Sequence, residues 1–153
     1  MEYYRKGSTD IIKNIYNVLK PGGILCLIDL DHNCLNHYGI PERLEKTILE
    51  ISEALQTKAN FDPYAGRKLY SYLYDLDFRN IKIDINAHHN IFGQLSDVDE
   101  YNFLKKIEVA PQKIGFHFDK YANYEEFIDE SRKSFREKRR FTYTPIILCR
   151  GEK

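Results

Sequence analysis

The chain has 153 residues and equal numbers of basic and acidic side chains, 23 of each, so its formal net charge is zero. Its 12 tyrosines and 9 phenylalanines argue for a folded domain and against disorder. The balanced charge disfavours nucleic acid or an anionic membrane as the partner of the whole protein. No apolar run is long enough to span a bilayer, and the N-terminus lacks the apolar core of a signal peptide.

The three cysteines, Cys26, Cys34 and Cys149, are odd in number, and two of them fall inside apolar runs. This pattern predicts small buried hydrophobic residues, as opposed to a disulfide framework. We therefore expect a cytoplasmic protein.

The first predicted elements are a helix, a tight turn and a strand. Ser8 to Asp10 offer N-cap residues, and an apolar stripe at helical spacing follows up to Leu19. Pro21 ends the helix and Gly22-Gly23 form the turn. The unbroken apolar run 24–28 is typical of a strand covered on both faces, as in a parallel sheet.

Two more helices and a strand are predicted next. Pro41 suits the first turn of a helix that buries Leu44, Ile48, Ile51 and Leu55. A third helix is expected from Asp62-Pro63 to about Asp77. Its predicted inward residues are Ala65, Leu69, Leu73 and Leu76. Strict alternation over 81–87 predicts an edge strand with one buried face.

The last third of the chain predicts two capped helices and a closing strand. Ser96 to Asp99 and Asn123 to Glu126 resemble capping boxes. The predicted inward residues are Leu104 and Ile107 in the first helix, and Phe127, Ile128, Ser131 and Phe135 in the second. Residues 145–149 predict a strand with proline at its first position. The order of elements indicates an α/β fold.

Three segments resemble the C-terminal half of Rossmann-like, S-adenosylmethionine-dependent methyltransferases. The sequence Leu-Lys-Pro-Gly-Gly at 19–23 is similar to the turn before the family's fifth strand, and 61–69 with 76–81 is similar to the helix and turn before its sixth. Most members have glycine where Asp77 stands. Residues 144–151 resemble the seventh strand, which in the family lies antiparallel between strands five and six.

The resemblance implies strands five to seven of a seven-stranded, mixed parallel and antiparallel sheet with flanking helices. It covers residues 1–153 as one truncated domain, with a helical substrate-side insertion at about 90–140. The family's glycine-rich loop and the acidic residue that binds the ribose are missing. We therefore expect no cofactor-binding residue, no S-adenosylmethionine on this chain alone, and an inactive isolated chain. The complete parent enzyme would use that cofactor.

The substrate-side candidates are Asp29, Asp31, His32 and Asn33, because ligands of open α/β sheets bind beyond the carboxyl ends of the strands. Asp31 or His32 could orient or deprotonate a nucleophile. The alternative is that the aspartates cap a turn and the histidine is solvated. No catalytic residue is identified, and the spacing of His37, His88 and His89 matches no metal signature.

Two features of the predicted insertion leave alternatives open. Its aromatic residues would form a pocket wall or a small satellite core: Tyr101, Phe103, Phe116, Phe118, Tyr121 and Tyr124. Its basic residues would complement a helix C-terminus, or would contact RNA or a phosphate: Arg132, Lys133, Arg136, Lys138, Arg139 and Arg140.

Two functions remain open, an enzyme fragment and a non-catalytic binding or assembly module. A small-molecule substrate is favoured over nucleic acid. The apolar strand 24–30 would have an open edge, which predicts a homodimer or pairing with the missing N-terminal half.

Overall fold

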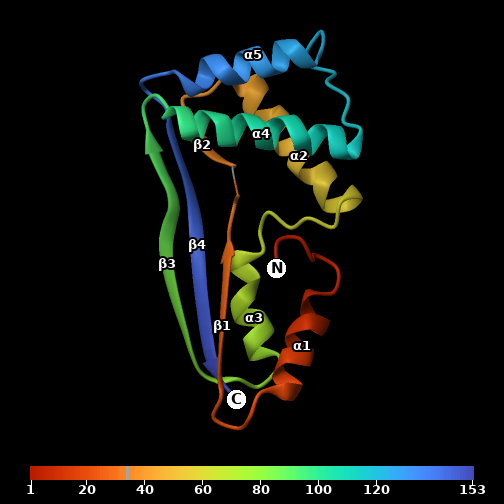
Figure 1. Ribbon diagram of the computed structural model, residues 1–153, viewed down its shortest axis with the longest axis vertical. Coiled ribbons are helices and arrows are strands. Elements are labelled where there is room, and N and C mark those ends of the chain that lie inside the picture. The colour runs from red at the N-terminus through yellow and green to blue at the C-terminus, as the bar shows by residue number, and fades with distance from the viewer. Residues whose placement is uncertain (34) are drawn as a thin grey trace. The chain divides into compact units, whose positions relative to one another are not determined.

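The computed structural model describes residues 1–33 and 35–153 (Figure 1). Its elements, in chain order, are α1 (Ser8–Val18), β1 (Ile24–Leu30), β2 (Asn36–Tyr38), α2 (Glu42–Lys58), the 3₁₀ turn η1 (Gly66–Lys68), α3 (Leu69–Tyr74), β3 (Arg79–Phe92), α4 (Asp97–Ile114), α5 (Tyr124–Phe135) and β4 (Phe141–Glu152). The fold is α/β, as the sequence predicts.

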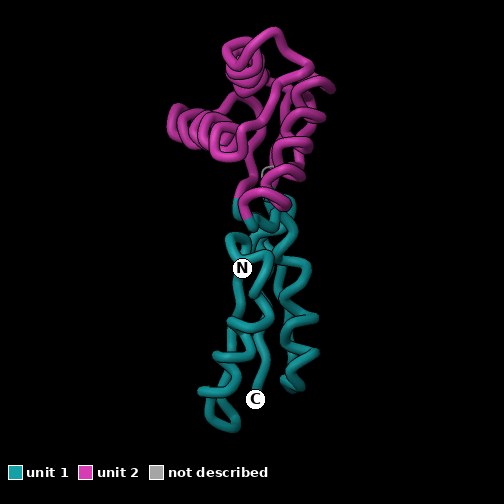
Figure 2. Tube along the Cα trace, turned by 90° about the vertical axis from the view of Figure 1, so that its right-hand side faces the viewer, with its two compact units in different colours: residues 1–33, 60–88, 144–153 teal, residues 34–59, 89–143 magenta. Residues whose placement is uncertain are grey.

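The chain forms two compact units (Figure 2). Unit 1 consists of residues 1–33, 60–88 and 144–153. Unit 2 consists of residues 34–59 and 89–143. Helix α2 therefore groups with the segment predicted as an insertion.

The sheet of unit 1 is organised around β4, which lies between β1 and β3 (Figure 1). Strand β1 pairs antiparallel with β4 in the register Ile24↔Glu152 to Leu30↔Ile146. The closing strand is thus antiparallel to the strand after the Pro-Gly-Gly turn, as expected. No parallel ladder is present among the described residues, because β4 separates the two strands that would otherwise be neighbours.

One face of this sheet carries the core of unit 1. Leu27 and Cys149 face Ile12 of α1 and Leu69 and Leu73 of α3, and all five are buried. The predicted inward positions of the first and third helices are confirmed at these residues. The prediction that β1 is covered on both faces is wrong, because side chains alternate across a strand and only one face meets helices. Ile24 is 65% exposed and Ile28 is 54% exposed.

The long strand β3 differs from its prediction. It extends over 79–92 instead of 81–87, and the face expected to be buried is covered only at Ile81. Ile83 and Ile85 are exposed.

The turns of unit 1 have the backbone conformations that the sequence predicts. Helix α1 ends before Pro21, and Gly22 has φ of +78°. Asp77 has φ of +58°, the left-handed conformation predicted from its place in the motif. Two predictions were wrong: the N-cap of α1 is Gly7, and the third helix begins at η1, not at Asp62. The Asp62 carboxylate accepts a hydrogen bond from the Tyr64 N–H, and this local turn delays the helix.

Unit 2 packs α2, α4 and α5 together through an aromatic-rich core. The predicted stripe of α2 is confirmed, with Leu44 and Ile51 buried. Both capping predictions are also confirmed: Ser96 Oγ accepts from the Asp99 N–H at 3.2 Å, and Asn123 Oδ1 accepts from the Glu126 N–H at 2.9 Å. On α5, Phe127, Ser131 and Phe135 form the predicted buried face.

The final strand begins earlier than predicted. Residues 141–143 of β4 pair with β2, in the register Asn36↔Tyr143 to Tyr38↔Phe141. Pro145, predicted to start the strand, lies inside it between the residues paired with β2 and those paired with β1. Proline has no N–H to donate, so it is tolerated where one ladder stops and the next begins.

The two cysteines that the structure describes differ in their exposure to solvent. Cys149 is buried as predicted, whereas Cys26 is exposed, because it lies on the uncovered face of β1. Cys34 lies outside the described residues. Across residues 1–33 and 35–153, no helix combines the length and apolarity needed to cross a bilayer.

Candidate functional site

The four predicted site residues follow one another at the carboxyl end of β1, and each is engaged with other residues of unit 1. Asp29 forms an ion pair with the N-terminal ammonium group of Met1. The same carboxylate accepts hydrogen bonds from the Glu2 N–H at 3.0 Å and the Leu30 N–H at 2.8 Å. Asp29 therefore holds the N-terminal segment against the strand.

Asp31 is buried and accepts two parallel hydrogen bonds from Arg67. The distances are 2.9 Å from Nε to Oδ1 and 2.8 Å from Nη2 to Oδ2. The Asp31 hydrogen bonds raise the pKa of the Arg67 guanidinium above its ordinary value. Because both carboxylate oxygens are occupied, Asp31 is poorly suited to accept a proton from a substrate.

His32 and Asn33 continue this cluster. His32 has φ of +51°, and its ring makes an edge contact with Tyr64 at a centroid distance of 4.8 Å. Asn33 Nδ2 donates to Glu2 Oε1, and its N–H donates to the Pro63 carbonyl. His32 is the member of the four whose side chain makes a ring contact, with no ion pair to hold it among the described residues.

The structure adds two residues that were not predicted for the site, Tyr64 and Arg67. The Arg67 guanidinium carbon lies 4.7 Å from the centroid of the Tyr64 ring, and the Arg67 side chain is half exposed. Beside it, Lys68 pairs with the buried Asp62. Tyr64 and Arg67 both lie in the segment 61–69 that carries the family resemblance. That resemblance was the feature of the sequence that could have pointed to these two residues.

Gly66 explains why segment 61–69 can reach β1. A Cβ at this position would lie 2.9 Å from the Leu30 carbonyl oxygen and 3.1 Å from Asp31 Cβ. Only glycine allows so close a contact. The end of β1 therefore presents the imidazole of His32 and two ion pairs, Arg67–Asp31 and Lys68–Asp62, whose cations are partly exposed.

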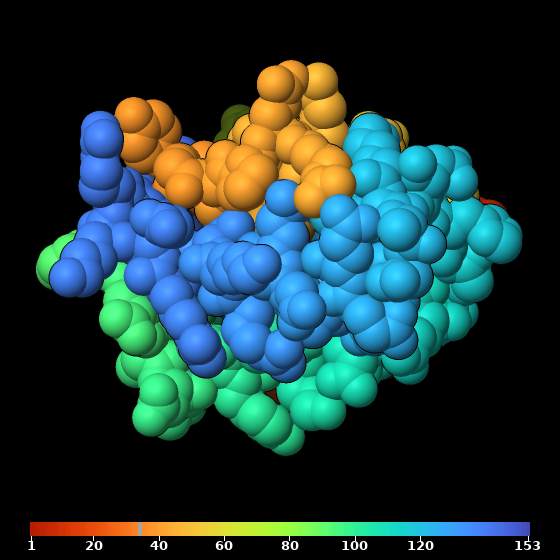
Figure 3. Space-filling view, turned by 90° about the horizontal axis from the view of Figure 1, so that it is seen from above, coloured from red at the N-terminus to blue at the C-terminus, as the bar shows by residue number. Residues whose placement is uncertain are grey.

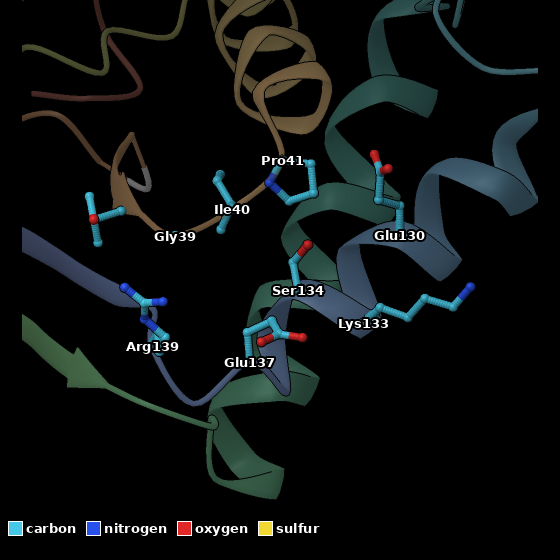
Figure 4. Close-up of a pocket in the computed structure, with 9 residues that line it drawn as sticks. Gly39, Ile40, Pro41, Glu130, Lys133, Ser134, Glu137 and Arg139 are labelled. Atoms are coloured by element: carbon cyan, nitrogen blue, oxygen red, sulfur yellow. The ribbon is translucent and has the colours of Figure 1, made fainter.

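Unit 2 contains a cleft of about 680 Å³ between the segment after β2 and the C-terminal half of α5 (Figure 4). Seen in space-filling form, the β2–α2 segment lies alongside α5 on this face (Figure 3). The lining combines both charge signs with a small apolar part: Tyr38, Gly39, Ile40, Pro41, Glu130, Lys133, Ser134, Glu137 and Arg139.

One wall of the cleft is fixed by a network around Glu130. Arg43 donates to both oxygens of this carboxylate, at 2.8 Å from Nη2 and 3.3 Å from Nε, and the Tyr121 hydroxyl donates at 2.6 Å. Burial opposes ionisation of Glu130, but the hydrogen bonds from Arg43 and Tyr121 hold its pKa below the ordinary value. Burial, followed by the bond to Glu130, raises the pKa of Tyr121.

The structure distinguishes the alternatives for the aromatic residues. Phe103 and Tyr121 are buried, and Phe116, Phe118 and Tyr124 pack against the core of unit 2, so the satellite-core interpretation holds for these five. Tyr101 is exposed. Arg132 and Arg136 form exposed ion pairs with Asp129 and Glu100, whereas Arg140 is buried.

No group of three or more histidine, cysteine, aspartate or glutamate side chains in the described part of the chain is arranged to hold a metal ion.

Comparison with known proteins gives a structural likeness that is distant. No protein-family model matches the chain, and no curated protein matches its sequence. Among solved structures, the chain is similar to phosphoethanolamine N-methyltransferase 2 of Haemonchus contortus, solved with phosphomonomethylethanolamine and S-adenosylhomocysteine. The identity is 11% and the TM-score is 0.39. The match covers 97% of this chain and 30% of that enzyme, so the chain spans less than a third of its length.

Proposed function

We propose that this chain is the C-terminal, substrate-side part of an S-adenosylmethionine-dependent methyltransferase of the Rossmann-like class. The observation that carries the proposal is the course of the chain in unit 1. The Leu-Lys-Pro-Gly-Gly segment leads into β1, and β4 pairs with both β1 and β3. This is the arrangement implied for strands five, seven and six.

The segment 61–69 supports the same proposal. Gly66 brings Arg67 within bidentate hydrogen-bonding distance of Asp31, at the sheet edge where ligands of such folds bind. In the proposed enzyme, Arg67 positions Asp31, and His32 and Asn33 face the methyl acceptor. His32 would accept the proton that the acceptor loses. A small-molecule acceptor fits the zero net charge better than nucleic acid does.

In the proposed parent enzyme, the preceding half of the domain holds S-adenosylmethionine and supplies the methyl group. The residues of this chain then position the acceptor for in-line displacement. The free thiols Cys26 and Cys149 fit a reducing compartment, so we place the protein in the cytoplasm.

Calorimetric titration of the purified chain with S-adenosylmethionine tests the proposal. We expect no heat of binding at millimolar ligand. Saturable binding in the micromolar range would instead mean that the chain builds its own cofactor site, and it would then have to be treated as an enzyme. A neighbouring reading frame that encodes a Gly-x-Gly loop would supply the missing half, and its product mixed with this chain should bind the cofactor.

A second candidate function, a non-catalytic assembly module, is favoured by the open edge of β1 and by its exposed apolar side chains. In the described structure β1 pairs only with β4, and its exposed side chains Ile24, Cys26 and Ile28 carry no charge. Strand β3 differs because Lys82 and Asp84 protect it against edge pairing. We therefore propose a homodimer in which two β1 strands pair across a two-fold axis.

Light scattering with size-exclusion chromatography tests the dimer. The wild-type chain should elute at twice its 18.2 kDa mass, and Ile28→Lys should convert it to a monomer. The matched control is Ile85→Lys, an exposed isoleucine on β3, which should leave the dimer intact. A wild-type chain that stays monomeric at high concentration contradicts this assembly.

A further inference from the structure

Arg140 is a buried cation without an acidic partner. Its side chain is 1% exposed. Among residues 1–33 and 35–153, no ion pair includes it. Its Nη2 donates to Thr142 Oγ1, but its Nε and Nη1 have no hydrogen-bond partner in the described part of the chain. Burial lowers the pKa of the guanidinium, which indicates that nothing nearby compensates the charge.

The groups around Arg140 are aromatic, neutral or basic. The guanidinium carbon lies 5.5 Å from the centroid of the Phe135 ring, and that ring contacts Phe103 at 5.6 Å. Thr142 Oγ1 also shares a hydrogen bond of 2.8 Å with His37 Nδ1. The ring of His89 also contacts this aromatic cluster, with its centroid 5.6 Å from that of Phe103. None of these groups supplies the negative charge that a buried guanidinium requires.

A buried charge costs stability unless an opposite charge and hydrogen bonds compensate it. Guanidinium groups bind carboxylate and phosphate oxygens best, because their N–H donors match the spacing of those oxygens. We propose that Arg140, together with Thr142 and His37, forms an anion-binding site that takes a small ligand bearing a phosphate or carboxylate group.

The cleft of unit 2 brings solvent close to this site. Arg139, the residue before Arg140, lines the cleft. A Cβ at Gly39, which also lines the cleft, would lie 3.1 Å from the Arg140 Cα, so the backbone at 139–140 forms part of the cleft wall. The backbone of Arg140 is therefore close to the cleft, while its side chain is buried.

Thermal unfolding of the whole chain in inorganic phosphate tests the site, with chloride keeping the ionic strength constant. The midpoint of the wild-type chain should rise saturably with phosphate. Arg140→Met should lose the phosphate-dependent rise and should unfold no earlier than wild type without phosphate, because it removes an uncompensated charge. The matched control is Arg150→Met, an exposed arginine in the same strand, which should keep the wild-type response.

Nuclear magnetic resonance of the ¹⁵N-labelled wild-type chain gives a second readout that does not depend on a variant folding. The Arg140 Nε–H signal should shift saturably on addition of phosphate, and Thr142→Val should weaken the binding several-fold. Acetate in place of phosphate distinguishes the two ligand chemistries. A signal that does not move with either anion, or a midpoint that rises equally in Arg140→Met, would overturn the site and leave the guanidinium bound to water alone.

Discussion

Gly66 lies against the Leu30 carbonyl oxygen so closely that a Cβ would lie 2.9 Å from it. The contact joins the motif segment 61–69 to the end of β1, and the atom it meets belongs to the backbone and cannot rotate away.

Gly66→Ala should therefore destabilise the protein by about 1–3 kcal/mol, the usual effect of overpacking. Urea denaturation followed by circular dichroism measures this change. The control is Ser71→Ala on the exposed side of α3, expected within about 0.5 kcal/mol of wild type. If Gly66→Ala were as stable as the control, segment 61–69 would not pack on β1 as described.

Asp77→Gly should stabilise the protein by about 0.5–1 kcal/mol. Asp77 has φ of +58°, a conformation that glycine adopts without a steric penalty. The matched control is Asp75→Gly two residues earlier, where φ is −66° and glycine should lower stability. Opposite signs for the two variants in urea denaturation are the expected result, and equal signs would contradict the turn geometry.

Glu130→Gln should change how stability depends on pH. The folded-state pKa of Glu130 is lowered, so its contribution to stability is present above about pH 4.3, the ordinary value for glutamate, and is lost as pH falls through the folded pKa. The variant should be less stable than wild type at pH 7, and the difference should shrink on acidification below about pH 4.

The control for this pH series is Glu53→Gln, an exposed glutamate on α2, which should follow the wild-type curve. Thermal unfolding at a series of pH values provides the comparison. A constant difference between Glu130→Gln and wild type from pH 3 to pH 7 would show that the pKa of Glu130 does not differ between the folded and the unfolded protein.

Cys26 should react with iodoacetamide much faster than Cys149. Cys26 is exposed, whereas burial raises the pKa of the Cys149 thiol and reduces its thiolate form. Peptide mass spectrometry after short labelling quantifies each residue separately. Cys149 should be labelled at the rate of Cys26 only in urea, and equal rates in the native protein would contradict the packing of β4 on the helices.

The predictable parts of the fold were those fixed by local chemistry. The caps at Ser96 and Asn123, the stop before Pro21 and the left-handed Asp77 each depend on a few neighbouring residues. The wrong predictions concern burial, which depends on the elements that pack against each face of the sheet. Ile24 and Ile28 have the composition of a strand buried on two faces, yet helices cover only one.

The candidate site likewise contains some residues that the sequence suggests and others that it does not. The sequence suggests Asp29, Asp31, His32 and Asn33 because they stand at the carboxyl end of an apolar strand, and their role as a site stays a prediction. Arg67 could not be predicted, because its hydrogen bonds to Asp31 bridge 36 positions of sequence. The burial of Arg140 was equally hidden, since in sequence it is the last of a run of basic residues that otherwise face solvent.

Lys153 continues the pairing of β4 with β1 as far as the Pro-Gly-Gly turn. Its N–H donates to the Gly23 carbonyl, its own carbonyl accepts from the Gly22 N–H, and its Nζ donates to the carbonyls of Tyr16 and Leu19 at the end of α1. Strand β1 has no other partner than β4 in the described structure. During synthesis on the ribosome, α1 and β1 therefore cannot form these contacts until residues 144–153 have left the exit tunnel. Throughout that interval the apolar strand 24–30 lacks its β4 partner, so it is exposed to pairing with other chains.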